Sequence, residues 1–212
     1  MNIVILGDKY QKGMKSRGCI GLLPYNNSNN LLQHQYRILS SIFPRCEIVY
    51  VYGFDQKRIY SFFKKNPRKN LTPVFNRNHD LYNSCFSLSI CKELFSDDVL
   101  IVHGGLKLTK KIFKKFNTDL GSQVFVNKKY HNDIGCIIEN KNIKNISFDL
   151  TNYIYDIYYI SKNNIALFRE LVIDKQNHNC FMFEIINKII DSGVAVHPHH
   201  IELESSTKIA CK

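Results

Sequence analysis

The chain has 212 residues, of which 44% are hydrophobic, and its formal net charge is +11. A chain of this length and composition can bury a full hydrophobic core, so a disordered or fibrous protein is excluded and a single globular domain is predicted. Its apolar runs are much shorter than the roughly 18 to 20 residues that cross a membrane. The N-terminus enters an apolar run at once, without the basic segment of a signal peptide. We therefore expect a cytoplasmic location and no membrane partner.

The positive charge has two interpretations. It can mark a nucleic-acid-binding surface, or it can reflect lysines and asparagines spread over the whole surface by an AT-rich genome. The densest clusters are "KKNPRKN" (64–70) and "KLTKKIFKK" (107–115). In the second, lysines surround Ile112, Phe113 and Phe116, as on the wet side of an amphipathic helix. No aromatic-rich nucleic-acid motif accompanies the clusters, so we expect a small phosphorylated ligand rather than a polynucleotide.

The seven cysteines are scattered, odd in number and without a C-x-x-C pair. This pattern favours reduced thiols over a disulfide framework or a zinc site. The histidines His197, His199 and His200 also lack a cysteine or carboxylate cluster nearby in the sequence, so we do not expect them to bind zinc.

In the first half of the chain, apolar runs alternate with amphipathic stretches. Strands are predicted at 2–6, 47–54, 72–76 and 99–102, and helices at 30–43, 57–65, 80–95 and 109–117. The helix at 30–43 places Gln35 among leucines on its apolar face, and the helix at 80–95 has Asp80 as its expected N-cap. Apolar strands separated by helices are typical of a mainly parallel sheet that is covered on both faces.

The second half contains strand-like segments with Asn-rich turns. They lie at 122–127, 134–140, 145–150, 153–161 and 194–203, and helices are predicted at 163–174 and 180–191. The segments suggest hairpins attached to the main sheet, and no linker or repeat interrupts them. The sequence thus predicts one α/β domain with a Rossmann-like three-layer α/β/α architecture and a mainly parallel, mixed central sheet.

Ligands of such sheets bind beyond the carboxyl ends of the strands. The loop at 7–18 and the turn at 103–105 therefore lie on the functional edge. Asp97 and Asp98 precede their strand and lie roughly 15 to 20 Å from its far end, at about 3.3 Å per residue. We expect them to be solvated turn residues without a catalytic role.

Five motifs along the chain are similar to those of a known family. They are "ILGDKYQKGMKSRG" (5–18), "GLLPYNNSNNLLQHQ" (21–35), "YNSCFSL" (82–88), "VLIVHGG" (99–105) and "IELESSTKI" (201–209). In this order they resemble the nucleotide-diphospho-sugar transferase superfamily, specifically the small nucleotidyltransferases that make NDP-sugars, CMP-sugars or CDP-choline-like products. The opening "DKYQKGMKS" is similar to phage-encoded members, and a viral source would place the protein in the host cytoplasm.

The resemblance implies a GT-A-like fold in which residues 1–120 form a nucleotide-binding half and residues 121–212 an acceptor-side half. It also implies an enzyme that joins a nucleoside triphosphate to a phosphorylated sugar or alcohol and releases pyrophosphate. The base, the acceptor and the oligomeric state are not encoded in any recognisable motif.

Nucleotidyl transfer requires N–H groups around the phosphates, cations that offset the phosphate charge, and in-line attack. Lys15 and Arg17, at the end of the basic loop, are the expected catalytic cations, and the guanidinium of Arg17 can bind two phosphate oxygens at once. The expected nucleotide-binding residues are Leu6, Gly7, Lys12, Gly13, Asn83, Ser84, His103, Gly104 and Gly105.

Each of these assignments has a structural alternative. The 7–18 loop can be an ordinary exposed basic loop, Asn83 can satisfy the local backbone at a helix start, and His103 can be a packed strand-end residue. These alternatives stay open at the level of sequence.

The resemblance also predicts a Mg²⁺ site between two aspartates, at whose positions this chain has Gly105 and Glu204. Glycine donates no side-chain oxygen, so three outcomes are open. Glu204, together with Glu202, holds Mg²⁺; or Lys107 replaces the charge of the metal; or the protein binds a nucleotide without turning it over. A related glycosyltransferase is a further alternative, although such enzymes usually carry an Asp-x-Asp motif that is absent here.

Overall fold

A computed structural model describes residues 1–9, 15–128 and 133–202. These residues form a nine-stranded mixed sheet in which the strand order is β3-β2-β1-β4-β8-β5-β9, and β6 pairs with both β7 and β8. The strands are β1 Asn2–Leu6, β2 Glu47–Tyr52, β3 Leu71–Phe75, β4 Val99–His103, β5 Gln123–Asn127, β6 Ile134–Glu139, β7 Asn142–Phe148, β8 Tyr153–Ile160 and β9 His197–His200. The helices are α1 Leu31–Ile42, α2 Gln56–Lys65, α3 Ser84–Ser89, α4 Ile165–Ile173 and α5 Met182–Asp191.

The sheet changes direction between β4 and β8. Strands β3, β2, β1 and β4 are mutually parallel, whereas β8 runs antiparallel to β4 and to β5. Because β8 is antiparallel, its second half pairs with β4, and the last residue of β4 in this pairing, Val102, lies beside Ile157 in the middle of β8. The carboxyl end of the parallel half therefore meets the middle of β8, and polar residues from both can share one site.

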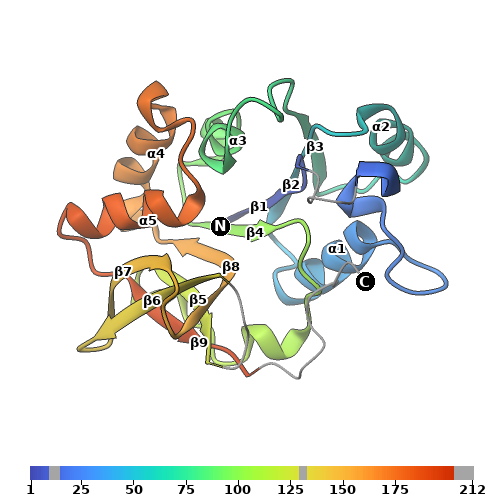
Figure 1. The fold of residues 1–212 in the computed structure, drawn as a ribbon. Helices are drawn as coiled ribbons and strands as arrows, with labels where there is room; N and C mark the ends of the chain where they lie inside the picture. The colour runs from blue at the N-terminus through green and yellow to red at the C-terminus, as the bar shows by residue number, and fades with distance from the viewer. Residues whose placement is uncertain (10–14, 129–132, 203–212) are drawn as a thin grey trace.

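Helices cover both faces of the sheet. On one face, the alternate strand residues Val4 and Ile101 pack with Leu88 of α3, Phe168 of α4 and Ile186 of α5. On the other face, strand residues such as Ile3, Ile5 and Val102 pack with the apolar sides of α1 and α2. Figure 1 shows α3, α4 and α5 gathered on one side and α1 and α2 on the other, with β1 and β4 between them. The predicted three-layer α/β/α architecture is confirmed. Among the helices of the described ranges, none is both long and apolar enough to cross a membrane.

The helix predicted over residues 80–95 is shorter than expected. Its α-helical part is α3, and a 3-10 turn at Lys92–Leu94 follows. The N-cap position is Asn83, whereas Asp80 lies in the preceding turn, so the prediction that Asp80 caps this helix is wrong.

The prediction of a helix over residues 109–117 is also wrong in length. The segment forms a 3-10 turn at Lys110–Phe113, and Lys115 then adopts a left-handed conformation with φ of 64° that stops any continuation. Ile112 and Phe113 are buried while the neighbouring lysines are exposed, as the amphipathic pattern indicates.

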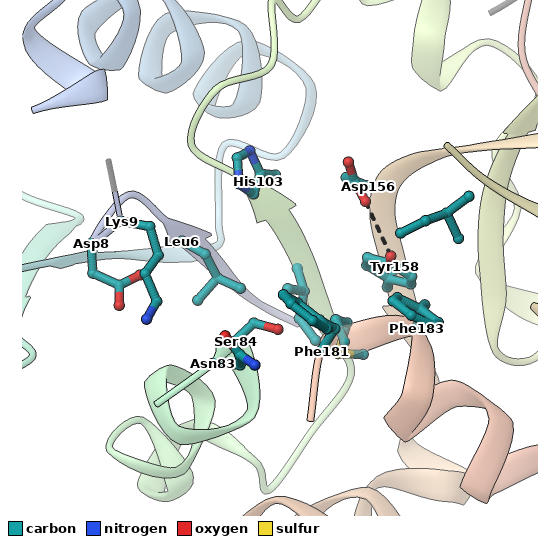
Figure 2. Close-up of a pocket in the computed structure, with 13 residues that line it drawn as sticks. Leu6, Asp8, Lys9, Asn83, Ser84, His103, Asp156, Tyr158, Phe181 and Phe183 are labelled. Carbon is teal, nitrogen blue, oxygen red and sulfur yellow. Dashed lines mark hydrogen bonds between the residues drawn. The ribbon is translucent and has the colours of Figure 1, made fainter. Parts of the chain in front are cut away.

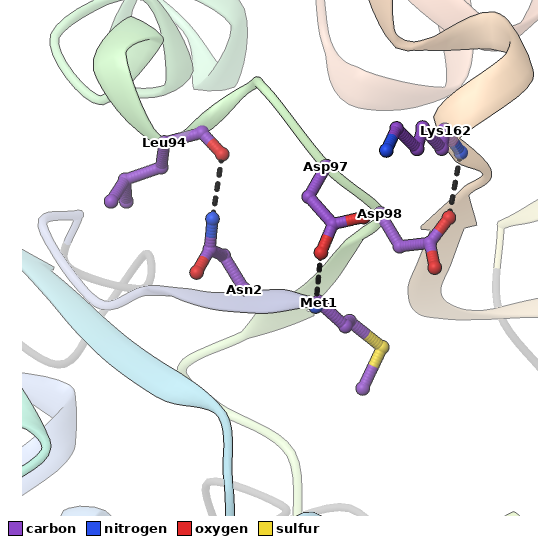
Figure 3. Close-up of polar contacts among 6 residues, drawn as sticks. All are labelled: Met1, Asn2, Leu94, Asp97, Asp98 and Lys162. Atoms are coloured by element: carbon purple, nitrogen blue, oxygen red, sulfur yellow. Dashed lines mark hydrogen bonds and ion pairs between the residues drawn. The ribbon is translucent and has the colours of Figure 1, made fainter.

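Asp97 and Asp98 are anchors at the amino end of β4, rather than merely solvated turn residues (Figure 3). The amino group of Met1 lies 2.6 Å from Asp97 Oδ2, and the backbone N–H of Lys162 donates to Asp98 Oδ1 at 2.6 Å. The hydrogen bond from the Met1 amino group holds the pKa of Asp97 below its usual value. These contacts tie β1 and β8 to the start of β4, the strand that lies between them.

Candidate functional site

A cavity of about 400 Å³ lies at the junction of the two halves of the sheet, and Figure 2 shows its labelled lining residues. The lining residues come from β1 and the loop after it, from β4, from the starts of α3, β6 and α5, and from the middle of β8. They are Leu6, Asp8, Lys9, Asn83, Ser84, Ile101, His103, Ile134, Asp156, Tyr158, Phe181, Met182 and Phe183. The cavity is thus located beyond the carboxyl ends of β1 and β4, where sheets of this class bind ligands.

Asp8 lies two residues after the end of β1 and is 2% exposed. Its Oδ2 accepts hydrogen bonds from Asn76 Nδ2 at 2.9 Å and from Ser87 Oγ at 2.7 Å. Its backbone carbonyl accepts from the N–H of Phe54 at 3.0 Å. These bonds connect the loop after β1 to the ends of β2 and β3 and to α3. Sequence reasoning did not identify Asp8, although its position two residues after a buried strand was a usable signal.

Lys9 places a cation on the same side of the cavity. Its ammonium donates to the backbone carbonyls of His79 and Tyr82. Burial lowers the pKa of Lys9, while the negative charges of Asp8 and Asp80 oppose that shift. The first loop is therefore connected through Lys9 to the chain segment that leads into α3.

His103 ends β4 and borders the cavity in Figure 2. Its Nδ1 accepts the backbone N–H of Gly105 at 3.1 Å. Since Nδ1 acts as an acceptor, the neutral ring carries its proton on Nε2. His103 is therefore able to donate a hydrogen bond to a phosphate oxygen in the cavity.

Gln35 of α1 fixes the turn that follows β4. Its side-chain amide nitrogen donates to the carbonyls of His103, Gly104 and Leu106 at 3.2, 3.2 and 2.8 Å. Gly104 is packed so closely that an added Cβ would lie 2.7 Å from Gly7 Cα. The glycine at 104 is thus explained by the close approach of β1 and β4.

Asp156 projects into the cavity from the opposite wall (Figure 2). It lies within β8 in a left-handed conformation, with φ of 44°. The pairing of β5 with β8 shifts register between Val124 and Val126, which oppose Tyr158 and Ile154 respectively, so Asp156 lies in a β-bulge. The Tyr158 hydroxyl donates to Asp156 Oδ1 at 3.3 Å. Burial, and then the charge of Asp156, raise the pKa of Tyr158 well above its ordinary value.

Aromatic rings form the rest of this wall. Phe181 immediately precedes α5, and its backbone N–H donates to Glu184 Oε2 at 2.7 Å. Its ring is stacked on that of Phe183, with centroids 5.9 Å apart and an interplanar angle of 8°. Phe183 in turn contacts Phe148 edge-on at 5.8 Å. Phe183 is buried, whereas Phe181 is 48% exposed at the cavity.

Four of the predicted nucleotide-binding residues line the cavity: Leu6, Asn83, Ser84 and His103. The three predicted glycines in the described part lie nearby, but their N–H groups are already bonded. Gly7 donates to Val51 O at 2.9 Å, Gly104 to Leu6 O at 2.7 Å, and Gly105 to the ring of His103.

The predicted catalytic cations do not line the cavity. Lys15 and Arg17 are exposed in a 3-10 turn. Lys12, Gly13 and Glu204 lie outside the described residues. The catalytic roles of Lys15 and Arg17 and the metal-binding role of Glu204 stay predictions.

The donor set for Mg²⁺ differs from the one that the resemblance implies. Within residues 1–9, 15–128 and 133–202, no three His, Cys, Asp or Glu side chains are grouped so that they could hold a metal ion. Gly105 supplies no oxygen, and Oδ2 of Asp8 already accepts two hydrogen bonds. The described residues therefore do not fit the expected two-carboxylate site.

Lys107 is also poorly placed to replace the charge of a metal ion. Its ammonium lies over the ring of Tyr25, 5.3 Å from the ring centroid. Neither Lys107 nor Tyr25 lines the cavity.

The sequence matches no family model and no curated protein. The structure nevertheless matches solved structures along nearly its whole length. CTP:phosphocholine cytidylyltransferase from Streptococcus pneumoniae superposes with a TM-score of 0.77 at 15% identity, over 95% of this chain and 90% of the other.

A putative glucose-1-phosphate thymidylyltransferase from Bacillus anthracis, in complex with a sucrose, gives a TM-score of 0.75 at 16% identity, over 95% and 87% of the two chains. The inositol-1-phosphate CTP transferase from T. maritima gives a TM-score of 0.74 at 15% identity, over 94% of this chain and 84% of the other. The chain therefore has the fold of these nucleotidyltransferases, and the fold that the sequence resemblance predicted is confirmed.

Proposed function

We propose that the protein is a nucleotidyltransferase that joins a nucleoside triphosphate to a phosphorylated sugar or alcohol and releases pyrophosphate. The observation that carries the proposal is the cavity that extends from the ends of β1 and β4 to the middle of β8 and the start of α5. Two substrates must meet in one cavity for transfer to occur. In this proposal residues 1–120 bind the nucleotide, and residues 121–212 hold the acceptor.

The nucleotide is held on the side of the cavity that contains the loop after β1. Asn83 and Ser84 at the start of α3 hydrogen-bond to the base or ribose. His103 donates its Nε2 proton to a phosphate oxygen, and Lys15 and Arg17 approach the leaving pyrophosphate. Mg²⁺ bound with the triphosphate would neutralise further phosphate charge.

In the reaction, an oxygen of the acceptor phosphate attacks the α-phosphorus while the bond to the pyrophosphate oxygen breaks in line. The acceptor phosphate is already an anion, so the step needs no general base. Catalysis then depends on positioning the two phosphates and on stabilising the charge that develops on the leaving group.

The test is pyrophosphate release from each of the four common NTPs with Mg²⁺ and a panel of phosphorylated sugars and alcohols. We expect one NTP and one acceptor class to react, and Arg17→Ala to lower kcat/KM by about 100-fold, as for loss of a group that stabilises developing charge. Lys64→Ala on the exposed side of α2 is the matched control and should leave kcat/KM unchanged. Nucleotide binding without pyrophosphate release from any pair would contradict the proposal.

A non-catalytic nucleotide-binding protein is the second candidate, and Gly105 favours it because the expected metal-binding aspartate is missing. In that case Gly105→Asp should create Mg²⁺-dependent nucleotide affinity, which calorimetry can measure. If the protein is instead an enzyme that works without an aspartate at this position, the same variant should lower its rate of pyrophosphate release.

A further inference from the structure

We propose that the surface formed by α2 and by the chain on either side of β3 binds single-stranded nucleic acid. This surface lies at the β3 edge of the sheet, whereas β9 forms the opposite edge (Figure 1). Three observations carry the inference: the concentration of positive charge, a cavity at the start of α2, and aromatic rings that lie beside the cations. The inference goes beyond the proposed nucleotidyl transfer and does not depend on it.

The positive charge of the chain is concentrated on this surface. Residues 56–79 contain seven Lys or Arg residues and no Asp or Glu, so they supply seven of the eleven net positive charges. All seven of these side chains are exposed. Arg58 is paired with Asp55 at 3.0 Å, and within the described ranges none of the other six forms an ion pair. We call these six residues the basic surface: Lys57, Lys64, Lys65, Arg68, Lys69 and Arg77.

This concentration favours a binding surface over a bias in composition. Lysines distributed by base composition alone would lie among acidic residues over the whole protein, whereas a continuous segment here has none. Six unpaired cations in one segment create a strong positive field, which attracts a chain of phosphates and is neutralised when that chain binds.

A cavity at the start of α2 gives a phosphate group a defined place within the basic surface. Its volume is about 400 Å³, and Lys57 of α2 and Arg77, which follows β3, both line it. Asp55 lines it too, but the carboxylate of Asp55 already contacts Arg58. Among the described residues, none lines both this cavity and the one at β4 and β8. Two cations from different elements thus share one cavity, and the guanidinium of Arg77 can bind two phosphate oxygens at once.

Aromatic rings lie among these cations. Lys57, Tyr60 and Lys64 are three and four residues apart, so they form one row along α2. The Tyr60 side chain is 49% exposed, and Lys64 Nζ lies 4.7 Å from the centroid of its ring. Beyond the helix, the guanidinium of Arg68 lies over the ring of Tyr36, 5.6 Å from its centroid. Because Tyr36 belongs to α1, this alternation of rings and cations arises only in the fold and is not visible in the lysine clusters of the sequence.

Rings beside cations favour a single strand over other polyanions. A single strand exposes base faces that stack on aromatic rings, while its phosphates bind the neighbouring cations. In a duplex the base faces are covered by stacking, so Tyr60 would find no partner there. An anionic membrane is disfavoured because Ile59 and Phe63, on the apolar side of α2, are buried in the core and cannot enter a bilayer. The 10 residues of α2 extend over about 15 Å, which suits contact with a few nucleotides.

The experiment measures binding of fluorescein-labelled 12-nucleotide oligothymidylate and oligouridylate to the full chain by fluorescence anisotropy. At about 50 mM NaCl we expect a Kd on the order of 1–100 μM for both, since stacking and phosphate contacts do not require a particular sugar. Contacts with about four phosphates predict that log K falls with log [NaCl] with a slope of about −3. The unlabelled competitors are a 12-base-pair duplex, inorganic polyphosphate, and vesicles of equal parts phosphatidylserine and phosphatidylcholine. Each should displace the labelled strand less well than unlabelled oligothymidylate does.

Variants separate stacking from charge. Tyr60→Ala should weaken oligothymidylate binding at least about fivefold, whereas Tyr60→Phe keeps the ring and should bind as the wild type does. Neither variant should change the affinity for polyphosphate, which has no bases. Lys57→Ala should weaken binding of both polyanions and make the salt slope shallower by about 0.7. Lys188→Ala, at an exposed position of α5, removes the same charge outside the basic surface and should leave oligothymidylate binding unchanged.

Failure of both oligonucleotides to bind at about 50 mM NaCl would overturn the inference. Wild-type affinity of Tyr60→Ala for oligothymidylate would do the same, because charge alone would then account for binding. Stronger displacement by the duplex, by polyphosphate or by the vesicles than by unlabelled oligothymidylate would show that another polyanion is the partner. None of these measurements detects pyrophosphate release, so their outcome leaves the nucleotidyltransferase proposal unaffected.

Discussion

Asp156 has a strained backbone conformation with a positive φ, and its side chain lines the cavity. Left-handed conformations cost L-residues roughly 1–2 kcal/mol, less for Asp and Asn, whereas glycine adopts them freely. The protein maintains this conformation within β8, where ordinary strand geometry would direct the side chain elsewhere. Stability and ligand binding therefore make opposite demands on this residue.

Replacing Asp156 by glycine should raise the free energy of unfolding by up to about 1 kcal/mol, because the strain is relieved. The same variant should raise the KM for the acceptor substrate of the proposed reaction, because Asp156 lines the cavity. Asp149→Gly is the matched control, since Asp149 also has a positive φ of 58° but does not line the cavity. It should gain similar stability in urea unfolding and leave that KM unchanged. A clear loss of stability in Asp156→Gly would show that the hydrogen bond from Tyr158 outweighs the strain.

The sequence predicted residues on the β1, β4 and α3 side of the cavity but none on the β8 side. The local apolar pattern predicts the elements at whose ends Leu6, Asn83 and His103 lie. All three residues line the cavity. Asp156 could not be placed in this way, because the run "YIYDIYYI" does not show where a bulge interrupts the alternation. A bulge depends on pairing with β5, which is distant in the sequence.

At the scale of elements, α1 determines the shape of the turn after β4. Its start is stabilised by a capping box, in which Asn30 and Gln33 bond each other's backbone N–H. The sequence placed Gln35 on the apolar face of this helix, and that prediction is confirmed, since Gln35 is fully buried. Its bonds to the turn are contacts between distant segments and could not be predicted from periodicity.

Gln35→Leu should lower the free energy of unfolding by about 2–4 kcal/mol, because it leaves buried carbonyls of the turn without a donor. Gln35→Glu should be at least as damaging, since a carboxylate cannot donate to those carbonyls. Gln33→Ala, on the same helix, removes part of the capping box and should cost about 1 kcal/mol. Urea unfolding of the three variants measures these changes in the free energy of unfolding. Wild-type stability of Gln35→Leu would mean that the turn is held by other contacts.

For the molecule as a whole, the order and type of most elements followed from the sequence, because buried parallel strands and amphipathic helices have distinct periodicities. The exceptions were two short segments, α3 and the turn at Lys110–Phe113, which are shorter than the helices that the sequence predicts. The position of β8 between β4 and β5 was not predicted either, since strand order depends on long-range pairing.

Four buried thiols should make the free energy of unfolding depend on pH in the alkaline range. Burial raises the pKa of Cys19 from 9.0 to about 11, and those of Cys85, Cys91 and Cys136 to about 12. Above pH 9 these thiols lose protons in the unfolded chain but keep them in the folded protein. The free energy of unfolding should therefore fall as pH rises from 9 toward 11.

Urea unfolding at a series of pH values measures this slope, and Cys136→Ala should make it shallower by the contribution of one thiol. A thiol reagent at pH 8 should label these four cysteines slowly in the native protein and rapidly in urea. Rapid labelling of all of them in the native protein would contradict the burial on which the prediction depends.

Among the described residues, the hairpin of β6 and β7 pairs with β8 at one position, Gly135 with Tyr153, and the N–H of Ile143 also donates to Val196 O, just before β9, at 2.8 Å. An added Cβ on Gly135 would lie 2.2 Å from Leu150 O, so this joint tolerates no side chain. Its far turn, at Asn140 and Lys141, is remote from the joint and exposed. Evolution can therefore lengthen or shorten that turn while the cavity keeps its geometry, and homologues are expected to vary most in length there.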